Sequence, residues 1–149
     1  MKKIIVGLAV LLNVLTVNAN AKVPVSDKVL QSFQKEFARA TNVNWVSWSE
    51  KNIFQATFTY DNARVEAYFD EDGDLLSTAR FITESQLPLM VMKVLSTDYA
   101  RYTVRRVVEY TENKEVYYLV TVFNEKGSMS LKFYSNGDVQ RVKQVKNKN

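Results

Sequence analysis

The chain has 149 residues and a formal charge of +4, with 20 Lys and Arg against 16 Asp and Glu. It contains no histidine and no cysteine, which excludes disulfide bonds, thiol catalysis and the imidazole or thiolate ligands typical of zinc, copper and haem sites. The charge surplus is too small to indicate nucleic-acid binding, which needs a concentrated basic face. We therefore expect no cofactor, no nucleic-acid partner and no enzyme activity.

Residues 1–21 have the pattern of a secretory signal peptide. Lys2 and Lys3 precede an apolar run from Ile4 to Val17, and Ala19-Asn20-Ala21 is a small-x-small cleavage motif. A membrane anchor is the alternative, but the run is shorter than the roughly 20 apolar residues of a membrane-spanning helix. We expect cleavage after Ala21, no stable membrane insertion, and a periplasmic or secreted mature protein.

Residues 22–149 are predicted to form a single domain, because no linker rich in Ser, Gly or Pro interrupts them. Two turns organise this domain, Asp72-Gly73 and Asn136-Gly137, and each pair is typical of a two-residue type I′ hairpin. When the chain is aligned with itself so that Gly73 falls on Gly137, the apolar residues around the two turns match. The match predicts two repeats, at about 24–82 and 83–146.

Each repeat is predicted to be a helix followed by four strands. The first helix begins after Ser26-Asp27 and ends by Thr41-Asn42, and the second runs from about Pro88 to Tyr99. Alternating apolar residues predict strands at 43–48, 54–60, 65–69, 75–82, 104–110, 116–123, 129–134 and 139–145. The predicted fold class is α+β and two-layer, a tandem duplication of a helix followed by a four-stranded antiparallel sheet (α-β4-α-β4).

The acidic segment from Asp70 to Asp74 resembles a calcium loop in composition only. With Gly73 at the sixth position of an EF-hand loop, the first position is Tyr68 and the twelfth is Ala79, where calcium requires carboxylates. Asp and Gly are also the residues that tight turns prefer. We therefore predict a plain turn and no metal site.

Several short motifs together resemble one family. They are the export signal, Val43-Asn44-Trp45 after the first helix, the turn from Phe69 to Gly73, Leu87-Pro88 before the second helix, and the strand and turn that end at Gly137. In this order they are similar to the PepSY-like, β-lactamase-inhibitor-protein-like (BLIP-like) family of small exported bacterial proteins. The resemblance implies a duplicated two-layer α+β fold and no catalytic residue.

One side of the second predicted sheet has the composition of a protein-binding surface. If Tyr118, Val120 and Val122 face the helix, alternation leaves an aromatic set on the other side. This set comprises Tyr117, Leu119, Thr121, Phe123, Lys132 and Tyr134. The alternative is that both faces are buried, by a loop, the other repeat or a second copy. The leading hypothesis is a non-enzymatic exported protein that binds a protein or peptide partner, for example by inhibiting an envelope enzyme.

Two further hypotheses remain open. An inhibitor could insert a charged hairpin tip into an enzyme cleft, and Lys51 and Asp72 are the candidate tip residues. Alternatively, a small apolar ligand could bind between helices and sheet, where Met90, Met92 and Met129 are expected. Side chains of this kind also form ordinary packed cores.

Overall fold

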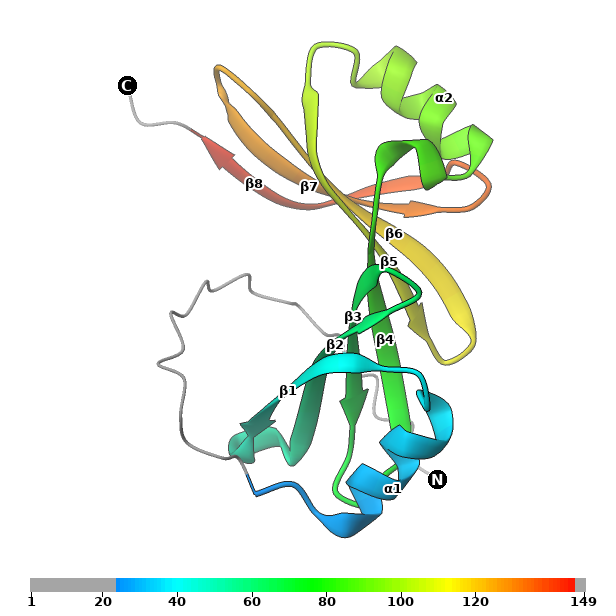
Figure 1. Ribbon diagram of the computed structural model, residues 1–149. Helices are drawn as coiled ribbons and strands as arrows, with labels where there is room; N and C mark the ends of the chain where they lie inside the picture. The colour runs from blue at the N-terminus through cyan, green and yellow to red at the C-terminus, as the bar shows by residue number, and fades with distance from the viewer. Residues whose placement is uncertain (1–23, 147–149) are drawn as a thin grey trace.

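The computed structural model describes residues 24–146, so the predicted signal peptide lies outside the described residues. Two α-helices and eight strands form the fold (Figure 1). The first half contains α1 (Asp27–Glu36), β1 (Thr41–Trp48), β2 (Ile53–Tyr60), β3 (Ala63–Phe69) and β4 (Leu75–Ile82). The second half contains α2 (Leu89–Asp98), β5 (Thr103–Glu112), β6 (Glu115–Asn124), β7 (Gly127–Tyr134) and β8 (Val139–Lys146). Two short 3₁₀ helices, η1 (Ser49–Lys51) and η2 (Glu84–Gln86), lie in the connections.

The predicted fold class is wrong. All eight strands belong to one antiparallel sheet in the order β1 to β8, and the protein is mostly β rather than a tandem repeat of separate helix-and-sheet units. The difference arises at β4 and β5, which pair over six residues from Ser77↔Glu112 to Ile82↔Val107. This pairing satisfies backbone groups that would otherwise lie at two exposed sheet edges. The sheet therefore continues through the middle of the molecule.

Both helices pack on the same face of this sheet but at opposite ends (Figure 1). Under α1, Val29 and Phe33 contact a core formed by Ala56, Phe58 and Phe69. Under α2, a second core is built from residues of the helix and of β5, β6 and β7: Val91, Leu95, Val107, Val120, Val122, Leu131 and Phe133. The predicted inward positions of the sixth strand, Tyr118, Val120 and Val122, are confirmed. Among residues 24–146, no α-helix packs on the opposite face of the sheet.

The turns at Gly73 and Gly137 differ from the predicted type I′ geometry. In each turn only the glycine has a positive φ, and its N–H donates to the carbonyl three residues earlier, Asp70 or Tyr134. The connection between β3 and β4 spans residues 70–74, which is too long for a two-residue turn. Two-residue loops with both φ angles positive occur instead at Asp61-Asn62 and Asn113-Lys114.

Within residues 24–146, no helix is long and apolar enough to cross a membrane.

Candidate functional site

The face of the sheet opposite the helices, called here the helix-free face, can be mapped from the strand register. Residues that pair across antiparallel strands point to the same side of the sheet. One row of side chains crosses the sheet at Phe81, Val108, Leu119, Lys132 and Gln140. The next row toward α1 contains Ala79, Tyr110, Tyr117 and Tyr134, and the next toward α2 contains Arg106, Thr121, Ser130 and Lys143.

The six residues predicted to form a partner surface lie together on this helix-free face. Tyr117 pairs with Tyr134, Leu119 with Lys132, and Thr121 and Phe123 follow along β6. Lys132 lies over two aromatic rings, with its Nζ 3.9 Å from the centre of the Tyr117 ring and 5.2 Å from that of Tyr134. The ring faces attract the ammonium group electrostatically, which favours this orientation of the lysine side chain.

The helix-free face is buried at its centre and accessible near Phe123, at the C-terminal end of β6. The ring of Tyr117 stacks on Tyr110, with centres 5.3 Å apart and planes inclined by 6°. As a result Tyr117 is only 8% exposed, whereas Phe123 is 40% exposed. Neither of the two alternatives weighed from the sequence describes the whole face, because neighbouring side chains cover its centre and leave its periphery accessible.

The sequence analysis missed the part of this face contributed by the first half. Glu66 is buried there, and its two carboxylate oxygens accept hydrogen bonds from Arg64 Nη2 at 2.8 Å and from Tyr68 Oη at 2.9 Å. The Arg64 guanidinium lies 4.7 Å above the Phe81 ring. The signal was present in the alternation of Arg64, Glu66 and Tyr68 along β3, which places all three on one face.

Three tyrosines at the centre of the face have raised pKa values. Burial raises the pKa of Tyr117 to about 12, and the charges of Glu112 and Tyr134 act in the same direction. Burial also raises the pKa of Tyr68 and that of Tyr110 well above the ordinary range, with Glu66 adding to both. These buried phenols therefore stay neutral to a higher pH than an exposed tyrosine, whose pKa is about 10.

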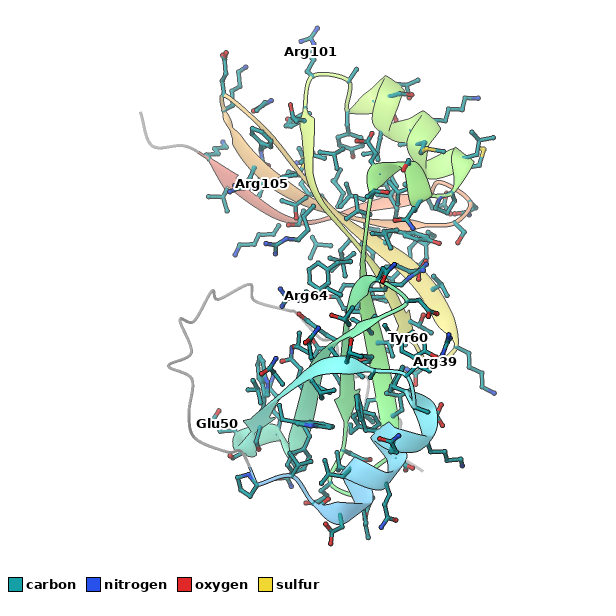
Figure 2. The ribbon with its side chains drawn as sticks, in the orientation of Figure 1. Arg39, Glu50, Tyr60, Arg64, Arg101 and Arg105 are labelled. Carbon is teal, nitrogen blue, oxygen red and sulfur yellow. The ribbon has the colours of Figure 1, made fainter. Side chains whose placement is uncertain are left out.

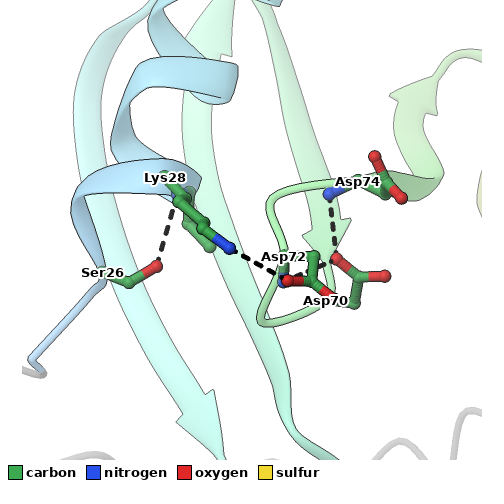
Figure 3. A network of polar contacts seen from close by, with 6 residues as sticks. Ser26, Lys28, Asp70, Asp72 and Asp74 are labelled. Carbon is green, nitrogen blue, oxygen red and sulfur yellow. Dashed lines mark hydrogen bonds and ion pairs between the residues drawn. The ribbon is translucent and has the colours of Figure 1, made fainter.

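The two predicted hairpin tips lie in different places. Lys51, in η1, lies 5.9 Å from the centre of the Trp48 ring at the β1 edge of the helix-free face. Asp72 accepts a hydrogen bond from Lys28 Nζ of α1 at 3.1 Å, on the helix side (Figure 3). Asp70 caps the same turn by accepting from the N–H groups of Asp72 and Asp74. The acidic turn is thus attached to α1 and lies apart from the aromatic set.

No group of three or more potential metal ligands occurs within residues 24–146. An open hollow of about 540 Å³ lies beside Phe123, with Arg101, Thr103, Glu125 and Lys126 in its wall. A second, of about 400 Å³, lies near the end of α2 beside Leu95 and Tyr99. None of the three methionines of the small-ligand hypothesis lines either hollow; Met129 is buried in the core and Met90 is exposed.

Comparison with known proteins identifies the fold. No family model and no curated protein sequence matches the chain. Solved structures do: a BLIP-like protein from Bacteroides fragilis has a TM-score of 0.74 and 23% identity, over 85% of this chain and 91% of that chain. A candidate periplasmic protein from Bacteroides eggerthii has a TM-score of 0.76 and 16% identity, over 83% and 91%.

A DUF2874 family protein from Bacteroides uniformis is similar as well, with a TM-score of 0.73 and 20% identity over 80% of this chain and 89% of that chain. At such identities the similarity concerns the fold alone, and fold does not determine function. The solved structures support the BLIP-like part of the resemblance found in the sequence, and they give no support to the PepSY-like part. The chain has a BLIP-like fold.

Proposed function

We propose that this is an exported, non-enzymatic protein that binds a polypeptide partner through the α2 half of its helix-free face. The observation that carries the proposal is an aromatic surface without a covering helix, on which Phe123 is exposed and Lys132 is held over two tyrosine rings. Aromatic side chains beside a cation, at the edge of a water-excluding centre, are typical of residues that dominate protein interfaces.

Two lines of support concern location and chemistry. A structural neighbour is described as a candidate periplasmic protein, and residues 1–21 of this chain have the pattern of an export signal. The sequence has neither histidine nor cysteine, so the histidine base that most often activates a serine nucleophile is missing, as is every thiol nucleophile. Binding to, or inhibition of, an envelope enzyme is the form of partner recognition that we propose, with the target unassigned.

The test compares proteins captured from an envelope extract by immobilised wild type and by two double variants. Phe123→Ser with Tyr134→Ser removes aromatic surface from the helix-free face; Phe123 lies outside the buried clusters, and Tyr134 is partly buried against the edge of one of them. Leu89→Ser with Met90→Ser is the matched control, because these residues are 75% and 46% exposed on α2. Circular dichroism establishes that each variant is folded.

We expect wild type and the α2 control to enrich the same proteins, and the Phe123/Tyr134 variant to lose most of them. Removal of a central aromatic contact typically costs about 2 kcal/mol or more of binding free energy, which is over tenfold in affinity. Equal capture by all three proteins would show that the helix-free face is not the contact surface. Loss of capture with the α2 control alone would move the site to the helices.

A further inference from the structure

The α2 half of the helix-free face carries a cluster of four cations, defined here as Arg105, Arg106, Lys132 and Lys143. The register brings three of them to one face, because Arg106 pairs with Thr121, Lys132 with Leu119, and Lys143 with Ser130. Arg106 and Lys132 are two strands apart, about 10 Å across the sheet, and Lys132 and Lys143 are on neighbouring strands.

A β-bulge supplies the fourth cation. The register of β5 shifts between Val104 and Arg106, so that Arg105 and Arg106 together oppose Thr121. Figure 2 shows Arg105 on the side of the sheet away from α1 and α2, the side on which Arg64 also lies. Bulges of this kind redirect side chains, and here the bulge places two consecutive guanidinium groups on one surface.

None of the four cations forms an ion pair with a carboxylate of the described residues. Within residues 24–146, no Asp or Glu oxygen lies within 4.0 Å of their charged nitrogens, and Arg64, by contrast, is paired with Glu66. Of the acidic strand positions on this face, Glu66 is paired with Arg64, and Glu112 and Glu115 lie four residues from Val108 and Leu119, about 13 Å away along the strands. The cluster therefore leaves a local positive field that an acidic partner would balance.

Apolar side chains lie directly beside the cations. Leu119 is opposite Lys132, Tyr117 is under its ammonium group, and Phe123 follows Thr121 on the same strand. A polyanion without apolar groups would leave these apolar side chains exposed to water. A polypeptide can cover them and pair with the cations at the same time.

We propose that this surface selects an acidic polypeptide segment in which carboxylates flank an aromatic or aliphatic side chain. The carboxylates pair with Arg105, Arg106, Lys132 and Lys143, and successive apolar side chains of the segment pack on Leu119 and on Phe123, which lie four residues apart on β6. This inference rests on the proposed function and adds the chemistry of the partner. Lys132 is the central contact, because it pairs with Leu119 and its ammonium group lies over the rings of Tyr117 and Tyr134.

The test uses three peptides of about ten residues that carry the same fluorophore: one alternating Glu and Phe, one alternating Lys and Phe, and one alternating Glu and Ser. Binding is followed by fluorescence anisotropy. We expect the Glu/Phe peptide to bind at least about tenfold more tightly than the other two, since it alone offers both kinds of contact. Its affinity should fall as salt is raised from about 50 mM to about 300 mM, because salt screens the exposed charges.

Charge reversal locates the site. Arg106→Glu with Lys132→Glu should weaken Glu/Phe binding by about tenfold or more, while Lys35→Glu with Lys93→Glu, the same change of charge on the exposed faces of α1 and α2, should leave it within about twofold. Equal weakening by the two pairs would overturn the proposal, as would equal binding of the Lys/Phe peptide. Equal binding of the Glu/Ser peptide would mean a general polyanion surface and would overturn it too.

The two proposals fail in different ways. If no acidic peptide binds but envelope proteins are still captured through Phe123 and Tyr134, the acidic-partner inference is wrong and the protein-binding function stands. If capture does not depend on those aromatic residues either, both are wrong.

Discussion

At the scale of single residues, the helix-free face combines groups that are costly to bury with partners that make burial tolerable. Glu66 illustrates this, because an unpaired buried carboxylate would cost several kcal/mol, and here Arg64 and Tyr68 donate to both of its oxygens. Among the described residues, no buried polar side-chain atom lacks a hydrogen-bond partner. The centre of the face is thus a satisfied polar and aromatic network rather than an exposed apolar patch.

The buried tyrosines predict a loss of stability in alkali. The pKa of Tyr117 is about 12 in the folded protein and about 10 in an unfolded chain. Between these values the unfolded chain releases the phenolic proton and the folded chain keeps it, so rising pH favours unfolding. The pKa difference limits the contribution of Tyr117 to about 3 kcal/mol, and Tyr68 and Tyr110 act in the same direction.

Urea unfolding at several values between about pH 9 and pH 11 measures this effect. We expect the free energy of unfolding to fall with pH, and to fall less steeply in Tyr117→Phe than in wild type. Comparison of the two proteins at neutral pH serves as the control, because it isolates the packing cost of the lost hydroxyl. Identical slopes in wild type and Tyr117→Phe would show that Tyr117 ionises alike in both states.

At the scale of elements, most strands and helices could be predicted because their signals are local. The period-two alternation of 54–60 and 116–123 identifies β2 and β6 and the face each side chain occupies, and Pro88 marks the start of α2. The geometry of the turns was harder to predict from the sequence. The Asp72-Gly73 pair is compatible with several turn types, and the length of the loop, set by where β3 and β4 stop pairing, decides among them.

In the candidate site, too, only the features with local sequence signals could be predicted. The six residues of β6 and β7 could be grouped from alternation alone, but the position of Asp72 could not. Its contact with Lys28 joins residues far apart in the sequence, and nothing local indicates that the turn lies against α1. The contribution of Arg64, Glu66 and Tyr68 likewise depends on β3 and β6 sharing one sheet.

The hairpin of β7 and β8 depends on a glycine. Gly127 begins β7 with φ +141°, and a Cβ atom there would lie 2.1 Å from the carbonyl oxygen of Val145 on β8. Gly137 also has a positive φ, +94°, but a Cβ there would make ordinary contact at 3.4 Å with Met90. Both glycines thus adopt a backbone conformation that other residues disfavour, and they differ in the space available for a side chain.

We predict that Gly127→Ala destabilises the protein clearly more than Gly137→Ala. Both variants should lose more than about 1 kcal/mol, because alanine disfavours a positive φ, and Gly127→Ala adds a clash with backbone that cannot rotate away. Urea unfolding of the two variants beside wild type makes the comparison. Equal losses would mean that β8 moves aside at little cost.

At the scale of the whole molecule, the pairing of β4 with β5 decides the architecture. From the sequence, these strands look like the end of one unit and the start of the next, and no local pattern states that their edges pair. Once they pair, the third buried cluster forms across the junction, with Tyr68 and Ala79 from the first half and Val108, Tyr110 and Tyr117 from the second. Arg80 and Glu109 add two hydrogen bonds between the same strands, at 3.0 and 3.1 Å.

Because the junction is both hydrogen-bonded and packed, we predict that the two halves unfold together. Both tryptophans, Trp45 and Trp48, lie in β1, so tryptophan fluorescence reports on the α1 half. Leu131, fully buried in the α2 core, provides a remote perturbation: Leu131→Ala should cost about 2–5 kcal/mol. In a two-state protein this cost lowers the urea midpoint seen by tryptophan fluorescence as much as that seen by far-ultraviolet circular dichroism.

As the control, Val142→Ala, on a residue that is 56% exposed on β8, should change stability by no more than about 0.5 kcal/mol. A fluorescence midpoint that stays at the wild-type value while the circular dichroism transition shifts or splits would show that the halves unfold separately, and that β4 and β5 join two units without coupling them.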